Sequence, residues 1–172
     1  VNGCGLTFEV VQTGGADHRC GIGVWRHSGR WERFDATVQQ ALGGTYGFAE
    51  GVWWLDEASE SYGGRAIELF AQVGSSNPSL TEIPGHFGPG LLLVGLFAPA
   101  QRGELGVGVT WVGVSREAGF SEPYELVVEV YSGVQLARWL RVEPDLLHIV
   151  NPGGDAAVRD ATVGTLRVSM IL

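Results

Sequence analysis

One stretch, residues 121–154, constrains the fold more than any other part of the sequence. It predicts two antiparallel strands joined by a tight turn at 137–139, with apolar residues at alternate positions. Because successive side chains of a strand point to opposite sides, one face is apolar along its length and the other carries charges of both signs. The apolar face consists of Tyr124, Leu126, Val128, Val130, Val134, Leu136, Leu140, Val142, Pro144 and Leu146.

Two environments accept such a hairpin. In a soluble sandwich the apolar face is the interior, whereas in an outer-membrane barrel it meets lipid and the charged face lines a wet lumen. The first strand, from Glu122 to Leu136, is far longer than the ~5–6 residues usual in soluble proteins. A membrane-crossing strand needs about 9–11 residues plus its ends, so the length favours the barrel.

The composition argues against a helical membrane protein and against a nucleic-acid-binding protein. No stretch reaches the ~18 consecutive apolar residues of a membrane helix, so a membrane role requires a barrel. The net charge of -8 argues against nucleic acid as a partner, because no basic patch exists to neutralise phosphates. The 27 glycines among 172 residues are typical of a β protein with many turns and closely packed strands.

The rest of the chain predicts further strands and a single domain over residues 1–172. Alternation indicates strands at 6–13, 19–27, 44–55, 64–74, 87–97, 105–115 and 161–172, which gives about nine strands in all. Residues 28–42 are polar and poorly periodic, so we expect an extended loop there, with a single helical turn at 37–42. Turns at 14–17, 98–103 and 137–139 alternate with longer loops such as 75–86. Short turns at one end and long loops at the other are typical of outer-membrane barrels.

Several of these segments resemble the carbohydrate-selective porins of Gram-negative outer membranes, the OprB-type family. The similar segments are LFAQVG at 69–74, GLLLVGL at 90–96, QRGELGVGVTWVGVS at 101–115, the whole of 121–154, and the closing VGTLRVSMIL. The resemblance implies an all-β, antiparallel up-and-down transmembrane β-barrel of about sixteen strands, a size that encloses an aqueous channel. About nine strands supply only part of it, so the expectation is an N-terminally incomplete C-terminal portion of a porin.

The resemblance also implies a function. A porin of this family lies in the bacterial outer membrane and lets small sugars diffuse passively through a water-filled channel, without enzymatic chemistry or a cofactor. The expected partners are small sugars and outer-membrane lipid, and a homo-oligomer is left open. The alternative from another class is a soluble periplasmic or secreted β-barrel that binds a small apolar ligand inside.

Alternation assigns a set of polar side chains to the channel wall. They are Glu68, Gln72, Glu125, Glu129, Tyr131, Arg141, Glu143, Asp145 and Arg167. Carboxylates and guanidinium groups can hydrogen-bond sugar hydroxyls, and an aromatic face can stack on the apolar side of a pyranose. We expect Glu129, Arg141 and Arg167 to contact the sugar, because they lie mid-strand. The plainer alternative is that these groups only solvate the wall and pair across strands.

Four tryptophans, Trp53, Trp54, Trp111 and Trp139, lie near predicted strand ends. This position suits the aromatic girdle that membrane proteins place at the lipid–water interface, and ordinary core packing is the competing interpretation.

The two cysteines are predicted to be free thiols. If the first hairpin turns at 15–16, Cys20 faces about Val11 and Cys4 faces about His27, an offset of roughly 23 Å along the strand. A disulfide needs α-carbons within about 7 Å.

Catalytic and metal-binding interpretations find little support in the sequence. The four histidines are dispersed, without metal-ligand spacing, and no nucleophile elbow or phosphate-binding loop occurs. Glu143 and Asp145 share a face as a glycosidase pair would, but no cleft signal accompanies them.

Overall fold

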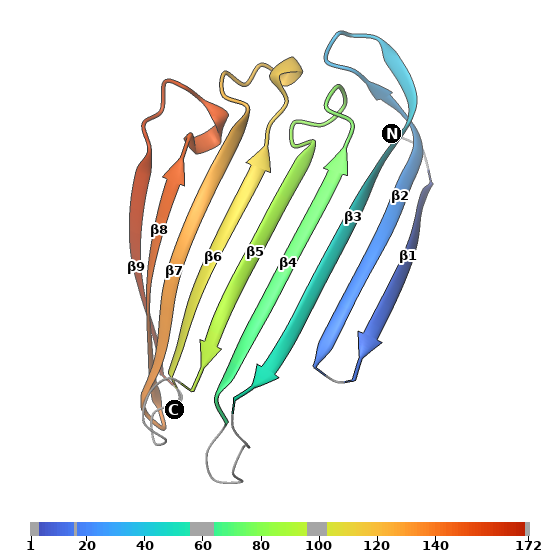
Figure 1. Ribbon diagram of the computed structural model, residues 1–172. Helices are drawn as coiled ribbons and strands as arrows, with labels where there is room; N and C mark the ends of the chain where they lie inside the picture. Colours follow the sequence, from blue (N-terminus) through green and yellow to red (C-terminus); the bar gives the residue numbers. More distant parts are fainter. Residues whose placement is uncertain (1–3, 16, 56–63, 96–102, 171–172) are drawn as a thin grey trace.

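The computed structural model describes residues 4–15, 17–55, 64–95 and 103–170, with the side chains of 39 and 40 left out. Nine antiparallel strands form a single sheet in which each strand pairs with the next one along the chain (Figure 1). The strands are β1 (Gly5–Gly14), β2 (His18–Glu32), β3 (Val38–Trp54), β4 (Ala66–Ser76), β5 (Gly85–Val94), β6 (Gly103–Gly113), β7 (Tyr124–Ala137), β8 (Leu140–Val150) and β9 (Ala161–Met170). Within the described ranges, no helix has the length and apolar character needed to cross a membrane.

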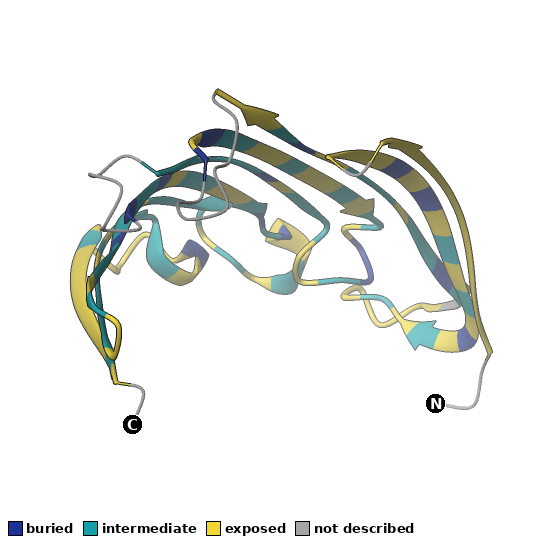
Figure 2. Cartoon of the chain, turned by 90° about the horizontal axis from the view of Figure 1, so that it is seen from below, coloured by how far each residue is buried: buried dark blue, intermediate teal, exposed yellow. Residues whose placement is uncertain are grey.

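The sheet curves into an open arch (Figure 2), and alternation along the strands gives its two faces different side chains. The convex face carries large apolar side chains that are exposed to the surroundings: Leu6, Phe8, Val10, Ile22, Val24, Leu69, Val73, Phe87, Val107, Val130, Leu146, Leu166, Val168 and Met170. Among the described residues the buried apolar side chains are only Leu42, Ala66 and Leu80. The described part of the chain therefore has almost no core of its own, and its apolar face needs an apolar solvent outside it.

This arrangement decides between the two environments that the hairpin allowed. A soluble barrel for an apolar ligand would turn its leucines and valines inward, whereas here alternate positions turn them outward. The antiparallel, up-and-down fold predicted from the sequence is confirmed, and the sheet is open at β1 and β9 as expected of part of a barrel.

The expected loop at 28–42 is wrong over most of its length. β2 continues to Glu32, and β3 begins at Val38, so the two strands pair beyond the predicted boundary. A register shift between His27 and Arg30 keeps them paired there. The polar sequence was misleading because strands can extend past the membrane into water, where no apolar alternation is required. The helical turn predicted at 37–42 is absent for the same reason.

The connections lie at the two ends of the sheet, but short turns and long loops are not confined to opposite ends as predicted. β1 ends and β2 begins at the lower end in Figure 1, the turn at 138–139 lies there too, and the connection at 96–102 lies outside the described residues. β3 ends at Trp54 and β4 begins at Ala66 at that same end, so more residues separate these two strands than the five, 33–37, that separate β2 from β3 at the other end.

The prediction of two free thiols is confirmed. Cys20 pairs with Gln12, one residue from the expected partner Val11. Cys4 lies at the far end of β1, where its carbonyl accepts a hydrogen bond of 3.0 Å from the backbone N–H of Ser28.

Hydrogen bonds join the connections at the upper end of the sheet. The backbone N–H of Phe34 donates to Ser79, 3.1 Å away, which joins the β2–β3 and β4–β5 connections. Ser115 of the β6–β7 connection donates its backbone N–H to Glu82 at 2.9 Å and its hydroxyl to the carbonyl of Pro78 at 2.5 Å. The β6–β7 and β8–β9 connections are joined by a bond of 3.0 Å from the N–H of residue 122 to the carbonyl of residue 154. All four connections thus form one linked rim.

Changing Ser115 to alanine should loosen this rim. The side chain is 2% exposed, so the variant loses a protected hydrogen bond, at a cost of about 1 kcal/mol. We expect faster proteolytic cleavage within 77–84 in detergent micelles, measured by mass spectrometry. Ser121→Ala is the control, because it removes an exposed hydroxyl of the same connection whose hydrogen bonds are to residues 155 and 156 and not to 77–84. Equal cleavage rates in wild type and Ser115→Ala would show that the bond does not restrain the loop.

Candidate functional site

The strand register places two rows of side chains on the concave face, each row made of successive cross-strand partners. The first row runs from β1 to β9 through Thr13, Arg19, Glu50, Phe70, Gly90, Gly108, Glu129, Leu147 and Val163. The second runs from β3 to β9 through Val52, Glu68, Leu92, Gly106, Tyr131, Asp145 and Thr165. Residues that are far apart in sequence therefore become neighbours on one wall.

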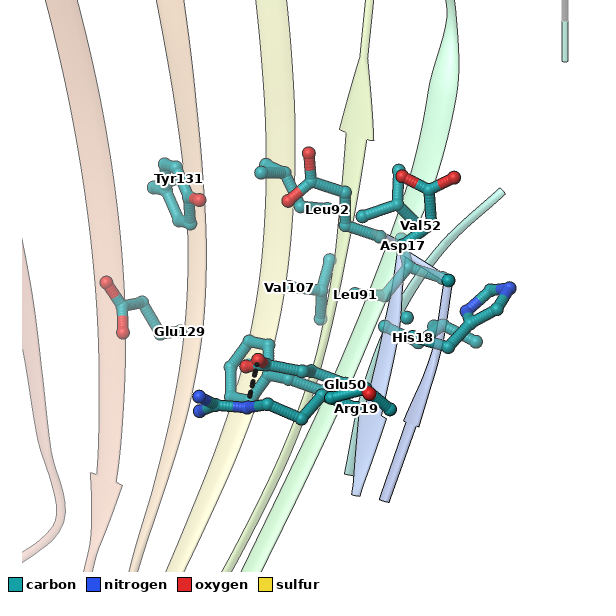
Figure 3. Close-up of a pocket in the computed structure, with 17 residues that line it drawn as sticks. Asp17, His18, Arg19, Glu50, Val52, Leu91, Leu92, Val107, Glu129 and Tyr131 are labelled. Carbon is teal, nitrogen blue, oxygen red and sulfur yellow. Dashed lines mark ion pairs between the residues drawn. The ribbon is translucent and has the colours of Figure 1, made fainter. Parts of the chain in front are cut away.

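A cavity of about 530 Å³ lies over these two rows, and we call it the central cavity. Its polar and aromatic lining includes Arg19, Glu50, Glu68, Phe70, Glu129 and Tyr131, with Asp17 at its edge. Figure 3 shows Arg19 and Glu50 extending from β2 and β3 toward the side where β7 carries Glu129 and Tyr131. A cavity bordered by both β1 and β7 must lie on the concave side of the arch, so these side chains face the lumen.

An ion pair provides charges of both signs in the central cavity. Nε of Arg19 lies 2.9 Å from Oε1 of Glu50, and the two side chains are 53% and 52% exposed. The guanidinium also lies 4.9 Å from the centre of the Phe48 ring, a cation–π contact. An exposed pair of this kind contributes at most about 1 kcal/mol to stability. Both groups therefore remain open to a solute that offers hydrogen-bond donors and acceptors.

A second hollow of about 440 Å³ adjoins the central cavity and shares Arg19, Glu50 and Phe70 with it. Its own lining includes Gln72, Tyr46, Phe48 and His86. The Tyr46 hydroxyl donates a 2.6 Å hydrogen bond to Oε2 of Glu9, reaching across Gly23 of the intervening strand. Gln72, predicted to face the channel, thus belongs to this adjoining hollow.

A separate charge cluster lies toward the turn end of β6 to β9. Arg141 pairs with Glu104 and with Glu143, whose Oε1 is 3.2 Å from the arginine Nε. Arg167 approaches the other oxygen of Glu143 at 4.0 Å. The Arg141 guanidinium passes over Gly133, where a Cβ atom would collide with it. The cluster thus crosses β7 at Gly133, where a larger residue would displace the ends of the Arg141 and Glu104 side chains.

The three preferred sugar contacts are therefore not brought together. Glu129 lines the central cavity, but Arg141 and Arg167 do not, among the described residues that line it. Arg141 is the second residue of β8, so its expected mid-strand position is wrong. The side chain of Arg167 is 77% exposed.

Two other predicted wall residues bind nearby groups of the chain. Glu125 accepts a 2.5 Å hydrogen bond from the N–H of Gly153, which anchors the β8–β9 connection. Asp145, the partner of Tyr131 in the second row, accepts a 3.2 Å hydrogen bond from the hydroxyl of Thr165. For both residues the plainer alternative, pairing within the wall, agrees with the contacts.

The tryptophans divide between the two faces. Trp53 and Trp111 alternate with inward residues and lie exposed on the convex face. Each is near the C-terminal end of its strand, and because β3 and β6 run in opposite directions these positions are at opposite ends of the sheet. Trp54 pairs with Ala66 on the inner side, so a lipid-facing position is wrong for it. Trp139 is exposed in the turn after β7. Core packing does not describe these exposed rings, and the interfacial girdle stays a prediction for Trp53, Trp111 and Trp139.

Sequence reasoning missed three residues of the central cavity: Arg19, Glu50 and Phe70. A usable signal existed, because Arg19 is two residues from Gly21, and Glu50 is two residues from Phe48, so the members of each pair share one face of their strand. The alternation pattern therefore assigns each residue to a face. It does not show that they are neighbours, which requires the register of β2, β3 and β4.

Comparisons with known proteins agree with this geometry. The family model described as "Carbohydrate-selective porin, OprB family" matches residues 22–171. The solved high-pH structure of Pseudomonas putida OprB superimposes with a TM-score of 0.77 at 18% sequence identity, covering 98% of this chain and 48% of that one. This chain thus spans about half the length of that protein. No curated protein matches the sequence. Because the family model covers most of the chain and the solved structure has the same fold, this chain belongs to the OprB family of carbohydrate-selective porins.

Proposed function

We propose that these nine strands form one side of a water-filled channel through which small sugars diffuse across the outer membrane. Membership in the family places the chain in the bacterial outer membrane, and the family and fold are those of channel proteins. The observation that carries the proposal is the opposition of the two faces. An exposed apolar convex face suits lipid, while a concave face with accessible charged side chains suits water and hydroxyl-rich solutes.

The central cavity supports sugars as the solute class. A sugar gives up hydrogen bonds to water when it approaches a wall, and the wall must replace them. Arg19 supplies several N–H donors, and Glu50, Glu68 and Glu129 supply acceptors on two sides of the same cavity. The exposure of the Arg19 and Glu50 side chains keeps their contacts weak, which allows a solute to leave as readily as it enters. Association with further copies stays a prediction.

Changing Glu129 to glutamine should weaken sugar binding within the channel. The variant removes a charged acceptor from the central cavity but keeps the size of the side chain, so we expect a loss of affinity of about three- to tenfold. Affinity is measured from the block of single-channel ion current by increasing concentrations of glucose. Assembly should be unaffected, because a hydrated wall position tolerates the loss of one charge.

Arg167→Gln is the matched control for this experiment. It also removes one charge from the inner wall, but at an exposed position outside the central cavity. We expect its glucose affinity to stay within about twofold of wild type. A wild-type channel whose current is insensitive to glucose would argue against the proposed function. If Arg167→Gln lost affinity and Glu129→Gln kept it, the site would lie in the charge cluster instead.

A further inference from the structure

Four phenylalanine and tyrosine side chains on the concave face lie over glycines of a neighbouring strand. The pairs are Tyr46 with Gly23, Phe48 with Gly21, Phe70 with Gly90, and Tyr131 with Gly106. At each of these glycines, a Cβ atom would come closer than 3.0 Å to the aromatic side chain. Each ring therefore rests against the wall where the adjacent strand offers only backbone.

Phe70 differs from the other three in what covers it. The Tyr46 hydroxyl is bound to Glu9, the Phe48 ring has the Arg19 guanidinium over it, and Tyr131 is half-buried. Phe70 is 50% exposed and lines both the central cavity and the adjoining hollow. Of the four rings, it offers the most open apolar surface to a solute in the lumen.

Along the row, the neighbours of Phe70 are polar side chains at both sides and glycines that carry no side chain. Its partner on β3 is Glu50, which carries the ion pair to Arg19. On the other side the row continues through Gly90 and Gly108 before it reaches Glu129 on β7. From Glu50 to Glu129 the row covers roughly 19 Å of wall, at about 4.8 Å per strand. A ring-shaped solute above Phe70 would thus have the aromatic ring beneath it over Gly90, bare backbone beside it at Gly108, and carboxylates further along the row.

We propose that Phe70 is a stacking platform that makes the channel prefer cyclic sugars over open-chain polyols, and that Gly90 keeps its ring flat against the wall. This inference rests on the proposed function. The face of a pyranose that carries C–H groups can lie on an aromatic face, whose electron-rich surface attracts the polarised hydrogens. The hydroxyls at the sugar edge then point toward Glu50 and Arg19. An open-chain polyol has the same hydroxyls but no flat C–H face, so it gains little from the ring.

The test compares the rates at which glucose and sorbitol enter liposomes that contain the folded barrel. The two solutes have nearly the same size and hydroxyl content, so their ratio removes effects of pore width. Phe70→Ala should lower the glucose-to-sorbitol ratio by about two- to tenfold, the range expected for one aromatic contact. Gly90→Ala should lower it in the same direction, because the methyl group displaces a ring that is still present. Phe70→Tyr should keep the wild-type ratio.

Phe48→Ala is the control, since it removes a neighbouring aromatic ring that Arg19 already covers. The unchanged migration of unheated samples in detergent gels shows that each variant is folded, and Phe70→Leu replaces any alanine variant that fails to fold. An unchanged ratio in the Phe70 variants, or an equal fall in Phe48→Ala, would overturn the inference while leaving the sugar channel intact. If wild-type liposomes admit neither solute, the proposed function fails and the inference fails with it.

Discussion

Replacing Val130 with arginine should prevent most of the protein from inserting into the membrane. Val130 is exposed on the convex face at the middle of β7, and its partners Val107 and Leu146 are also exposed there. A charge near the centre of the bilayer costs about 2–4 kcal/mol on the lipid-facing side of a barrel. The expected result is a loss of the folded, heat-modifiable band from outer-membrane fractions, measured against total protein.

Two control variants show whether the effect depends on placing a charge on the lipid-facing side. Val130→Leu keeps an apolar group at the same position and should insert normally. Glu129→Gln alters the adjacent residue on the lumen side and should also insert normally. If Val130→Arg inserts and Glu129→Gln does not, the two faces are assigned backwards, and a soluble barrel with an apolar interior becomes the better description.

The second large effect is expected at Arg141, where a methionine should destabilise the folded sheet by about 1.5–3 kcal/mol. Arg141 lies between the carboxylates of Glu104 and Glu143, and the three side chains are 29%, 25% and 23% exposed. Without the guanidinium, the partly shielded Glu104 carboxylate loses this partner, and the Glu143 carboxylate keeps only the more distant Arg167, at 4.0 Å. Urea unfolding in detergent micelles, followed by tryptophan fluorescence, measures the change in the free energy of unfolding.

A double variant shows whether the loss comes from the charges. In Arg141→Met with Glu104→Gln, the side chain at position 104 that lost its ion-pair partner is neutral, so part of the lost stability should return. A double variant as unstable as the sum of both single variants would mean that Arg141 stabilises the sheet through packing over Gly133 alone. If Arg141→Met unfolds at the wild-type urea concentration, the cluster does not contribute to stability.

The architecture was predictable because it follows from a short-range property of the chain. Alternation of Val128, Glu129 and Val130 assigns side chains to faces without any knowledge of neighbouring strands. The same rule failed at 28–42, where the strand leaves the apolar environment that enforces alternation. There, only the pairing of β2 with β3 defines the strand.

The functional site was predictable only residue by residue. Glu68, Glu129 and Tyr131 were assigned to the correct face, and the register then places all three in the central cavity. Arg141 shares that face but lies in a different cluster, because its position along the strand depends on where the β7–β8 turn begins. The face on which a side chain lies is determined by alternation within its own strand. Which residues become neighbours on the channel wall depends on the offsets between strands, and the alternation pattern does not contain these offsets.

The direction of the two edge strands has a consequence for how the arch can be closed. β1 and β9 run in the same direction. Each strand is antiparallel to the next, and the step from the first to the last of an odd number of strands contains an even number of reversals. A second copy of this sheet, inserted in the same orientation, would place β9 beside a parallel β1 at both seams. An all-antiparallel wall contains an even number of strands. Only a partner segment with an odd number of strands can therefore complete the circle, which excludes closure by simple duplication of this sheet.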